Sequence, residues 1–202
     1  MRALLRRQTT RAISARALSR RTLSDLLWCA CGVNRARGPF GMPGRTSASA
    51  SNSQEIDVYV TTAHGTYLYE PRSHGLRQVT PEDLRIFAIS RGQSQEDRGA
   101  SAPVRLIYVA DLDRLEHTSG FEEPGLHDAE VQRSYYYVDT GLVAANVYLF
   151  ASSRGLATWF HNCDRRALAR RLPLRNEQHV LFAQTVGHAR GRPAHRGRRS
   201  IR

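Results

Sequence analysis

The chain has 202 residues and a formal net charge of +12, with 41% hydrophobic and 24% charged residues. This length suits one folded domain with a substantial core, and the composition is that of an ordinary globular protein. Because no apolar run reaches about 18 residues, we expect no transmembrane helix, and no apolar secretion signal precedes the domain.

The positive charge is concentrated at the two ends. Residues 1–21 contain seven Arg and no acidic residue, and residues 188–202 contain six Arg and no acidic residue. The part between them is almost neutral, so the basicity does not belong to the expected core. A basic tail can contact nucleic acid, but no helix-turn-helix, zinc-finger or aromatic RNA-binding motif accompanies it. We expect one domain over residues 1–190 and a disordered basic tail over residues 191–202.

The three cysteines are Cys29, Cys31 and Cys163. An odd number of cysteines without a secretion signal favours free thiols in a reducing compartment, so we expect a cytoplasmic protein. Cys29 and Cys31 are two residues apart on an expected helix and do not face each other. His161 and Cys163 lack further ligands nearby, and no metal site is expected.

The first half of the chain combines one helix with a run of strands. Apolar spacing predicts a helix over residues 22–31, capped by Thr22 or Ser24. A loop rich in Gly, Pro, Ser and Ala follows over residues 34–54. Alternating β-forming residues predict a hairpin from residues 56–60 and 66–69, with a third short strand over 76–79.

The second half is dominated by one long helix. We expect a helix over residues 81–90 with Pro81 at its first position, a polar loop over 91–103, and a fully covered strand over 104–110. One apolar stripe predicts a helix over residues 126–154; it comprises Val131, Tyr135, Val138, Leu142, Ala145, Leu149 and Ser152. A strand over 156–160, a short helix over 165–172 and a strand over 178–186 follow. The class is α+β because helices and strands do not alternate regularly.

Four stretches, in this order, resemble the nitroreductase superfamily, especially its branch of azoline-oxidising dehydrogenases (the SagB type). They are Arg7-Gln8-Thr9-Thr10-Arg11 with the helix that follows; residues 45–54 running into the strand at 55–60; Asp139-Thr140-Gly141 with Asn146 and residues 155–158; and Ala183-Gln184-Thr185-Val186-Gly187. The resemblance covers about residues 6–190.

The resemblance implies a fold, a partner and a cofactor. It implies a mixed, largely antiparallel sheet with helices on both faces, and a homodimer that packs through the helix at 126–154. It also implies bound FMN, with a flavin in each of two interface sites. The activity implied is ping-pong hydride transfer from NAD(P)H through the flavin to a nitro, quinone or related organic acceptor. No side chain is expected to act as acid or base.

Twelve residues are implied as cofactor contacts. Arg7 and Arg11 suit the phosphate of FMN, to which Gln8 and Thr9 add neutral donors and Arg190 a further cation. The small loop containing Ser49, Ala50, Asn52 and Gln54 would lie against the isoalloxazine ring, with Asn52 bonding its edge. The turn at His161, Asn162 and Cys163 would bring a backbone N–H to flavin N5.

Two alternatives remain open at this point. The Arg- and Ser/Thr-rich start of the chain is also typical of an organelle transit peptide. Ala48 stands where the family usually has Pro, and Gln8 stands where a second basic residue is common. These departures favour a second hypothesis, in which the chain is an inactive flavin-fold protein that serves as a structural or maturation partner.

Overall fold

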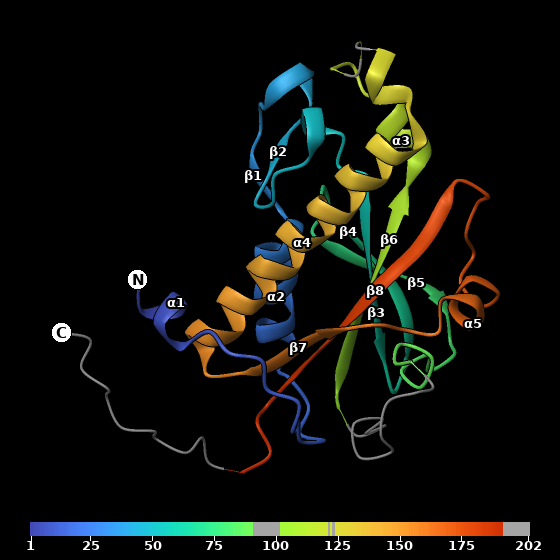
Figure 1. Cartoon of the computed structure of the whole chain (residues 1–202). Coiled ribbons are helices and arrows are strands. Elements are labelled where there is room, and N and C mark those ends of the chain that lie inside the picture. The colour runs from blue at the N-terminus through green and yellow to red at the C-terminus, as the bar shows by residue number, and fades with distance from the viewer. Residues whose placement is uncertain (91–101, 121, 123, 192–202) are drawn as a thin grey trace.

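The main feature of the computed structural model is a six-stranded sheet with the strand order β5-β4-β3-β6-β8-β7 (Figure 1). The structure describes residues 1–90, 102–120, 122 and 124–191. The strands are β3 (Ile56–Thr62), β4 (Gly65–Glu70), β5 (Gly75–Thr80), β6 (Val104–Asp111), β7 (Ala157–His161) and β8 (Gln178–Gly187). A separate small ribbon is formed by β1 (Val33–Arg35) and β2 (Gly44–Arg45).

Every strand pairing in the described part of the chain is antiparallel, so the expectation of a mixed sheet was wrong there. The connection through the long helix joins β6 to β7, and these two strands do run in the same direction. However, β8 lies between them and pairs antiparallel with both. A parallel ladder would need the two strands to be neighbours.

The predicted meander β3–β4–β5 and the predicted central strand β6 are confirmed. Thr62 pairs with Gly65 across the first turn, and Gly65 has φ +127°, a conformation that favours glycine. All eight residues of β6 are buried, because the strand lies between β3 and β8 and is covered on both faces. Its continuous apolar run reflects this double coverage.

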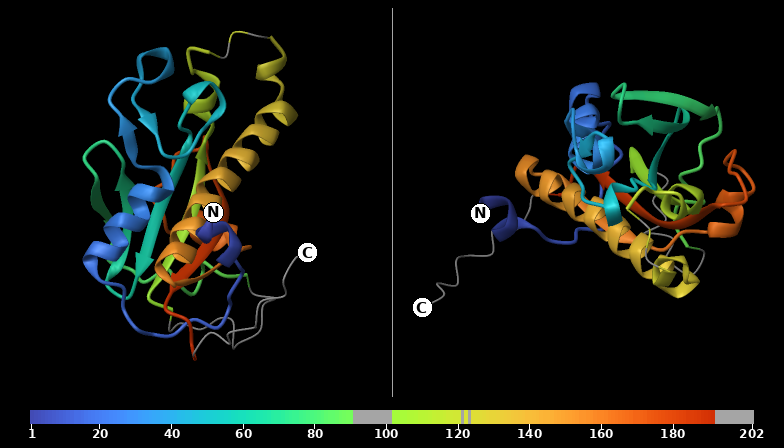
Figure 2. Two further views of the ribbon diagram at one scale, coloured as in Figure 1. Left: turned by 90° about the vertical axis from the view of Figure 1, so that its left-hand side faces the viewer. Right: turned by 90° about the horizontal axis from the view of Figure 1, so that it is seen from above.

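Two helices cover one face of the sheet (Figures 1 and 2): α2 (Arg20–Cys31) and α4 (Ala129–Arg154). Helix α2 begins two residues before the predicted start, and its cap is neither Thr22 nor Ser24. The Ser19 hydroxyl accepts the Thr22 N–H at 3.0 Å, which satisfies a free N–H of the first turn. Helix α4 begins three residues later than predicted, behind Asp128 as its cap, and ends at Gly155 with φ +66°.

Most of the predicted apolar stripe of α4 does not face the sheet, although Tyr135 packs against the core cluster. The side of α4 that packs on the sheet is a different set: Tyr136, Asp139, Thr140, Val143, Ala144, Val147, Phe150 and Ala151. Val138 and Leu142 of the predicted stripe are 59% and 40% exposed. The helix therefore has two apolar sides, and the middle of the predicted one, at Val138, Leu142 and Ala145, is exposed.

The opposite face of the sheet carries α5 (Arg165–Ala169) and residues 81–90, which are not the predicted helix. They form turns, and Leu84, Ala88 and Ile89 are buried. The Leu84 N–H donates to the Thr61 hydroxyl at 3.0 Å rather than continuing a helix, so contacts with β3 override the local helical pattern. The polar loop expected over residues 91–103 lies mostly outside the described residues.

The remaining elements are short. They are α1 (Arg2–Arg6), η1 (Pro39–Gly41), η2 (Ala50–Asn52), α3 (Leu112–Glu116) and η3 (Pro124–His127), so the predicted loop over 34–54 contains two strands and two 3-10 turns. Within the described ranges, no helix is long and apolar enough to cross a membrane, and no group of His, Cys, Asp and Glu suits a metal ion. The tail at 192–202 lies outside these ranges.

Candidate functional site

The N-terminal segment runs along the outer edge of β7. The Thr10 N–H donates to the Thr158 carbonyl at 3.0 Å, and Ile13 forms a β-bridge with Ala189. Ile13 is 4% exposed and belongs to a small apolar cluster that includes Trp159. This segment therefore contributes a core residue and packs as part of the fold.

Three predicted site residues of this segment contact two aromatic rings. We call Arg7, Thr9 and Arg11 the arginine cluster. The Arg7 guanidinium lies 5.5 Å from the ring centre of Tyr148 on α4, and the Arg11 guanidinium lies 5.4 Å from that of Trp159 on β7. The hydroxyls of Thr9 and Tyr148 are 3.2 Å apart. Cation–π contacts therefore fix the arginine side chains on the protein surface.

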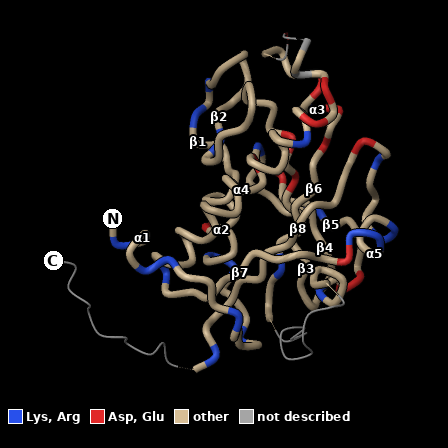
Figure 3. Tube along the Cα trace, viewed as in Figure 1, with Lys and Arg blue, Asp and Glu red and all other residues tan. Residues whose placement is uncertain are grey.

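The charges of the arginine cluster are available to a ligand. Arg7 and Arg11 are exposed, and no ion pair with a carboxylate is found for either among the described residues. Figure 3 shows the acidic residues of α3 well away from α1 and the segment that follows it. An exposed pair of guanidinium groups with a nearby hydroxyl is a donor set that suits a phosphate dianion.

Two further predicted phosphate contacts lie on or beside this segment. The Gln8 side chain is exposed between Arg7 and Thr9. The Arg190 N–H donates to the Ala12 carbonyl at 2.8 Å, and its guanidinium donates to the Ile13 carbonyl at 3.4 Å. The structure thus brings Arg190 to the same segment, with its side chain directed at the backbone.

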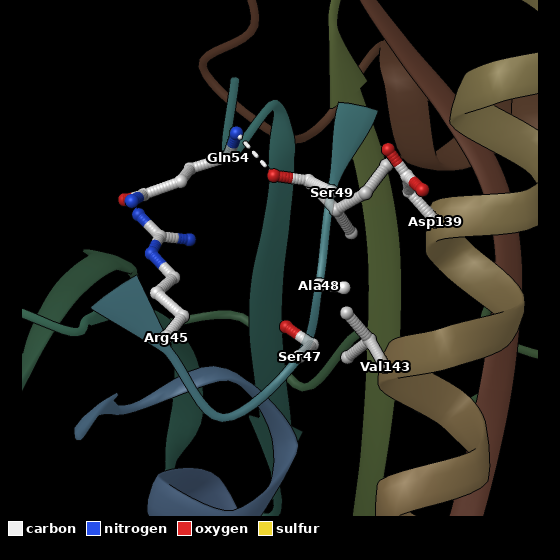
Figure 4. Close-up of a pocket in the computed structure, with 8 residues that line it drawn as sticks. Arg45, Ser47, Ala48, Ser49, Gln54, Asp139 and Val143 are labelled. Carbon is white, nitrogen blue, oxygen red and sulfur yellow. Dashed lines mark hydrogen bonds between the residues drawn. The ribbon is translucent and has the colours of Figure 1, made fainter. Parts of the chain in front are cut away.

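The second part of the candidate site is the 49–54 loop, which contains the predicted Ser49, Ala50, Asn52 and Gln54. The Ser49 hydroxyl accepts the Gln54 N–H at 2.9 Å (Figure 4). The Asn52 amide donates to the Pro39 carbonyl at 3.2 Å and accepts from the Gln54 amide at 3.0 Å. These bonds hold the polar side chains of the loop in fixed positions.

The backbone of the 49–54 loop is strained. Ser51, Asn52 and Gln54 have φ of +47°, +57° and +56°, three of the five positive values at non-glycine residues in the described chain. Such conformations cost about 1–3 kcal/mol each and persist only where the surroundings enforce them. A loop with three such residues is held in its conformation by contacts with the rest of the protein and not by local backbone preference. Strained loops of this kind are typical of binding sites.

A pair of buried carboxyl groups lies behind this loop. Glu55 is fully buried and Asp139 is 4% exposed, and Asp139 accepts the Ala50 N–H at 2.8 Å. Burial and the neighbouring Asp139 raise the pKa of Glu55 to about 8, and burial also raises the pKa of Asp139. Asp139 also lines a cavity of about 10 Å³ between the loop and α4 (Figure 4), which is close to the space of one water.

The third part is the end of β7, with the predicted His161, Asn162 and Cys163. The His161 ring is buried, its Nε2 lies 2.8 Å from the Thr185 hydroxyl, and burial lowers its pKa to about 4. The Cys163 thiol is buried, which raises its pKa to about 12. Neither side chain is therefore a charged group at neutral pH, and Asn162 alone of the three is exposed.

The structure groups some predicted residues and separates others. The arginine cluster, Arg190 and β7 adjoin one another, whereas the 49–54 loop contacts α4 at Asp139, nine residues before Tyr148. At 1.5 Å per residue these two points are about 13 Å apart along the helix. Tyr148 and Glu55 were not among the predicted site residues. The only signals in the sequence were a Tyr within an apolar helix and a Glu that opens an apolar strand.

Known proteins resemble most of the chain in sequence and fold. A model of the nitroreductase family matches residues 4–188. A candidate nitroreductase of Methanocaldococcus jannaschii is 29% identical over 161 residues, which are 77% of this chain and 74% of that protein. A crystal structure of a candidate nitroreductase from Ralstonia eutropha has a TM-score of 0.79 and 33% identity, covering 95% of this chain and 83% of its own.

A more distant structure shares the fold. The Escherichia coli microcin synthetase complex McbBCD, with truncated pro-MccB17 bound, has a chain with a TM-score of 0.71 and 19% identity. The match covers 89% of this chain and 68% of that one. At this identity the likeness concerns the fold alone.

Proposed function

The chain belongs to the nitroreductase family, and on that basis we propose that it is an FMN-dependent oxidoreductase. It would take hydride from NAD(P)H and pass the electrons to a nitro, quinone or related organic acceptor by a ping-pong mechanism. The observation that carries the proposal beyond family membership is the arginine cluster. Its two exposed guanidinium groups and the Thr9 hydroxyl match the phosphate of FMN in charge and donor type.

The residues of the chain would bind and orient the cofactor rather than react with the substrate. When bound, the flavin ring supplies the hydride chemistry at N5. Arg7, Arg11 and Thr9 would hold the phosphate, with Gln8 and Arg190 beside it. The small residues Ser49 and Ala50 leave room for a flat ring against the loop.

The end of β7 would face the other side of the ring. The Thr158 carbonyl and the Phe160 N–H both point to the outer edge of β7, where Thr10 and Tyr148 bind them. Asn162 follows at the same two-residue spacing, so its N–H would point to that side as well. His161 and Cys163 would keep this turn in place from the core.

We propose a homodimer that completes each site. The uncovered side of α4 presents Val138 and Leu142 with the exposed Gly141 and Ala145, small enough for close approach of a second helix. The arginine cluster and the 49–54 loop meet α4 at separate points. A second copy packed antiparallel on this side of α4 would bring the loop of one protomer towards the arginine cluster of the other.

The test of the flavin proposal is the visible spectrum of the purified full-length protein, followed by acid release and identification of the chromophore. Stoichiometric FMN, and oxidation of NADH or NADPH with a quinone or nitro acceptor, are the expected results. A protein that binds added FMN but oxidises neither nucleotide would favour the inactive flavin-fold alternative. A protein that does not take up FMN would refute the cofactor assignment. The single domain over 1–190 and the cytoplasmic location stay predictions.

A further inference from the structure

A buried carboxyl oxygen in the structure lacks a conventional hydrogen-bond donor. The Oε2 atom of Glu55 accepts the Ser53 hydroxyl at 2.6 Å, but Oε1 is buried without a donor among the described residues. The neighbour that interacts with this carboxyl group is the carboxyl group of Asp139. Two ionised carboxylates cannot bond each other, and a buried acceptor without a partner is costly.

A single proton resolves this conflict. If Glu55 is protonated, it donates to Asp139, and the pair carries one negative charge instead of two. Asp139 then accepts from two sides, because the Ala50 N–H already donates to its Oδ2 at 2.8 Å. Burial and mutual repulsion both act to keep this proton in place, as the direction of the pKa shift of Glu55 indicates.

The proton-sharing pair connects three parts of the molecule. Glu55 stands at the end of the 49–54 loop, directly before β3, and Asp139 lies on α4. The pair accepts two hydrogen bonds from the strained loop: Asp139 accepts the Ala50 N–H, and Glu55 accepts the Ser53 hydroxyl. Loss of the shared proton would place two negative charges side by side at this junction and push the loop away from α4.

We propose that Glu55 and Asp139 are positioning residues, and that the proton they share holds the 49–54 loop in the shape that binds the flavin ring. This inference rests on the proposed flavin function. On this inference, two side chains that do not touch the cofactor control how tightly it binds. The affinity for the cofactor then decreases at alkaline pH.

Two arginines lie near the pair, and among the described residues only Arg114 is paired with carboxylates. Arg114, behind β3, pairs with Asp57 at 2.7 Å and with Asp111 at 3.1 Å, and its guanidinium reaches only the backbone carbonyl of Glu55. Arg45 lines the same cavity as Asp139 (Figure 4), and an arginine stays charged at any accessible pH. These groups therefore do not supply the pH dependence.

The test compares the wild type with Glu55→Gln, whose amide donates to Asp139 as the protonated acid does but does not titrate. Glu82→Gln, which alters an exposed carboxylate, is the matched control. The first readout is the Tm of the apoprotein from pH 6 to pH 9. Because the pKa of Glu55 is raised in the folded protein, the stability that its proton contributes is lost as the pH rises towards that pKa. Between pH 6 and pH 9 the Tm of the wild type should therefore fall by about 5 °C relative to the Tm of Glu55→Gln. Glu82→Gln should follow the wild type.

The second readout is the Kd of FMN, from fluorescence quenching over the same pH range. The wild-type Kd should rise about tenfold between pH 7 and pH 9, and that of Glu55→Gln by less than about twofold. Comparison with the variant removes the titration of FMN itself. If Glu55→Gln does not fold, Asp139→Asn replaces it. This variant removes the negative charge beside Glu55, so its Tm should fall at a more acidic pH than the Tm of the wild type does.

The outcomes separate this inference from the flavin proposal. If the wild type binds no FMN at any pH, the flavin proposal and the positioning role both fail. The Tm readout then tests only whether Glu55 and Asp139 share a proton. If FMN binds but Glu55→Gln keeps the wild-type pH profile in both readouts, the inference is wrong and the flavin proposal stands. If Tm alone responds, the pair is structural and its role in positioning the loop is refuted.

Discussion

Replacing Arg11 by Ala is the most direct test of where the cofactor phosphate binds. The Arg11 side chain is exposed, rests 5.4 Å from the ring centre of Trp159, and stands next to Thr9 and Arg7. The change removes one cation from the proposed phosphate site without opening a cavity in the core. We therefore expect Arg11→Ala to fold normally and to bind FMN less tightly.

The size of the loss follows from the kind of contact removed. A hydrogen bond to a charged group contributes about 1.5–3 kcal/mol, which corresponds to a Kd about 10- to 150-fold higher. The lost cation–π contact at an exposed site is worth about 0.5–1 kcal/mol and affects the segment rather than the ligand. Because the contact is ionic and exposed, the ratio of the two Kd values should shrink as the salt concentration is raised.

The assay is a fluorescence titration of the apoprotein with FMN and, separately, with riboflavin, which has the same ring and no phosphate. Arg11→Ala should lose affinity for FMN and keep its affinity for riboflavin. Arg16→Ala, an exposed arginine in the same segment, is the control and should change neither. An equal loss for both ligands, or no loss for FMN, would refute the location of the phosphate.

Three further changes test other parts of the molecule. Tyr148→Phe removes the hydroxyl that accepts the Phe160 N–H at 2.9 Å, so the free energy of unfolding should fall by about 1–2 kcal/mol in denaturant titrations, and an unchanged value would contradict the contact. Leu142→Glu places a charge on the uncovered side of α4 and should convert the proposed dimer to a monomer in sedimentation experiments; a wild-type mass would argue against this interface. Gly187→Ala adds a Cβ that would lie 2.6 Å from Ile13, so Tm should fall by about 5 °C, whereas Gly125→Ala, with open space around it, should leave Tm near the wild-type value; equal Tm values for the two would contradict the close packing.

The elements predicted well from the sequence are those whose conformation follows from residues close together in the chain. The run over 104–110 is apolar throughout because β6 is covered on both faces, and a continuous apolar run of strand length is typical of such double coverage. The hairpin over 56–69 follows from alternation and from a turn that needs Gly65. In both cases the residues close to each other in the chain carry the information.

Elements that depend on distant contacts were predicted poorly. Periodicity showed that α4 has an apolar stripe, but it could not show which of two apolar sides meets the sheet. Residues 81–90 have a helical pattern, yet a bond from Leu84 to Thr61 decides their conformation. For the site, the motif around Arg7 to Arg11 was visible in the sequence. The contact between Glu55 and Asp139 was not, since the two positions are 84 residues apart in the sequence.

The segment along β7 also has a consequence for how the protein behaves once it is cut. An edge strand with free N–H and C=O groups is a template onto which another chain can add a strand. Here the Thr10 N–H donates to the Thr158 carbonyl, and the Tyr148 hydroxyl accepts the Phe160 N–H. Other parts of the same chain therefore cover this edge. Proteolysis after residue 14 would remove the core residue Ile13 together with Thr10, which would leave the Thr158 carbonyl unpaired, and the truncated protein would be prone to self-association through β7.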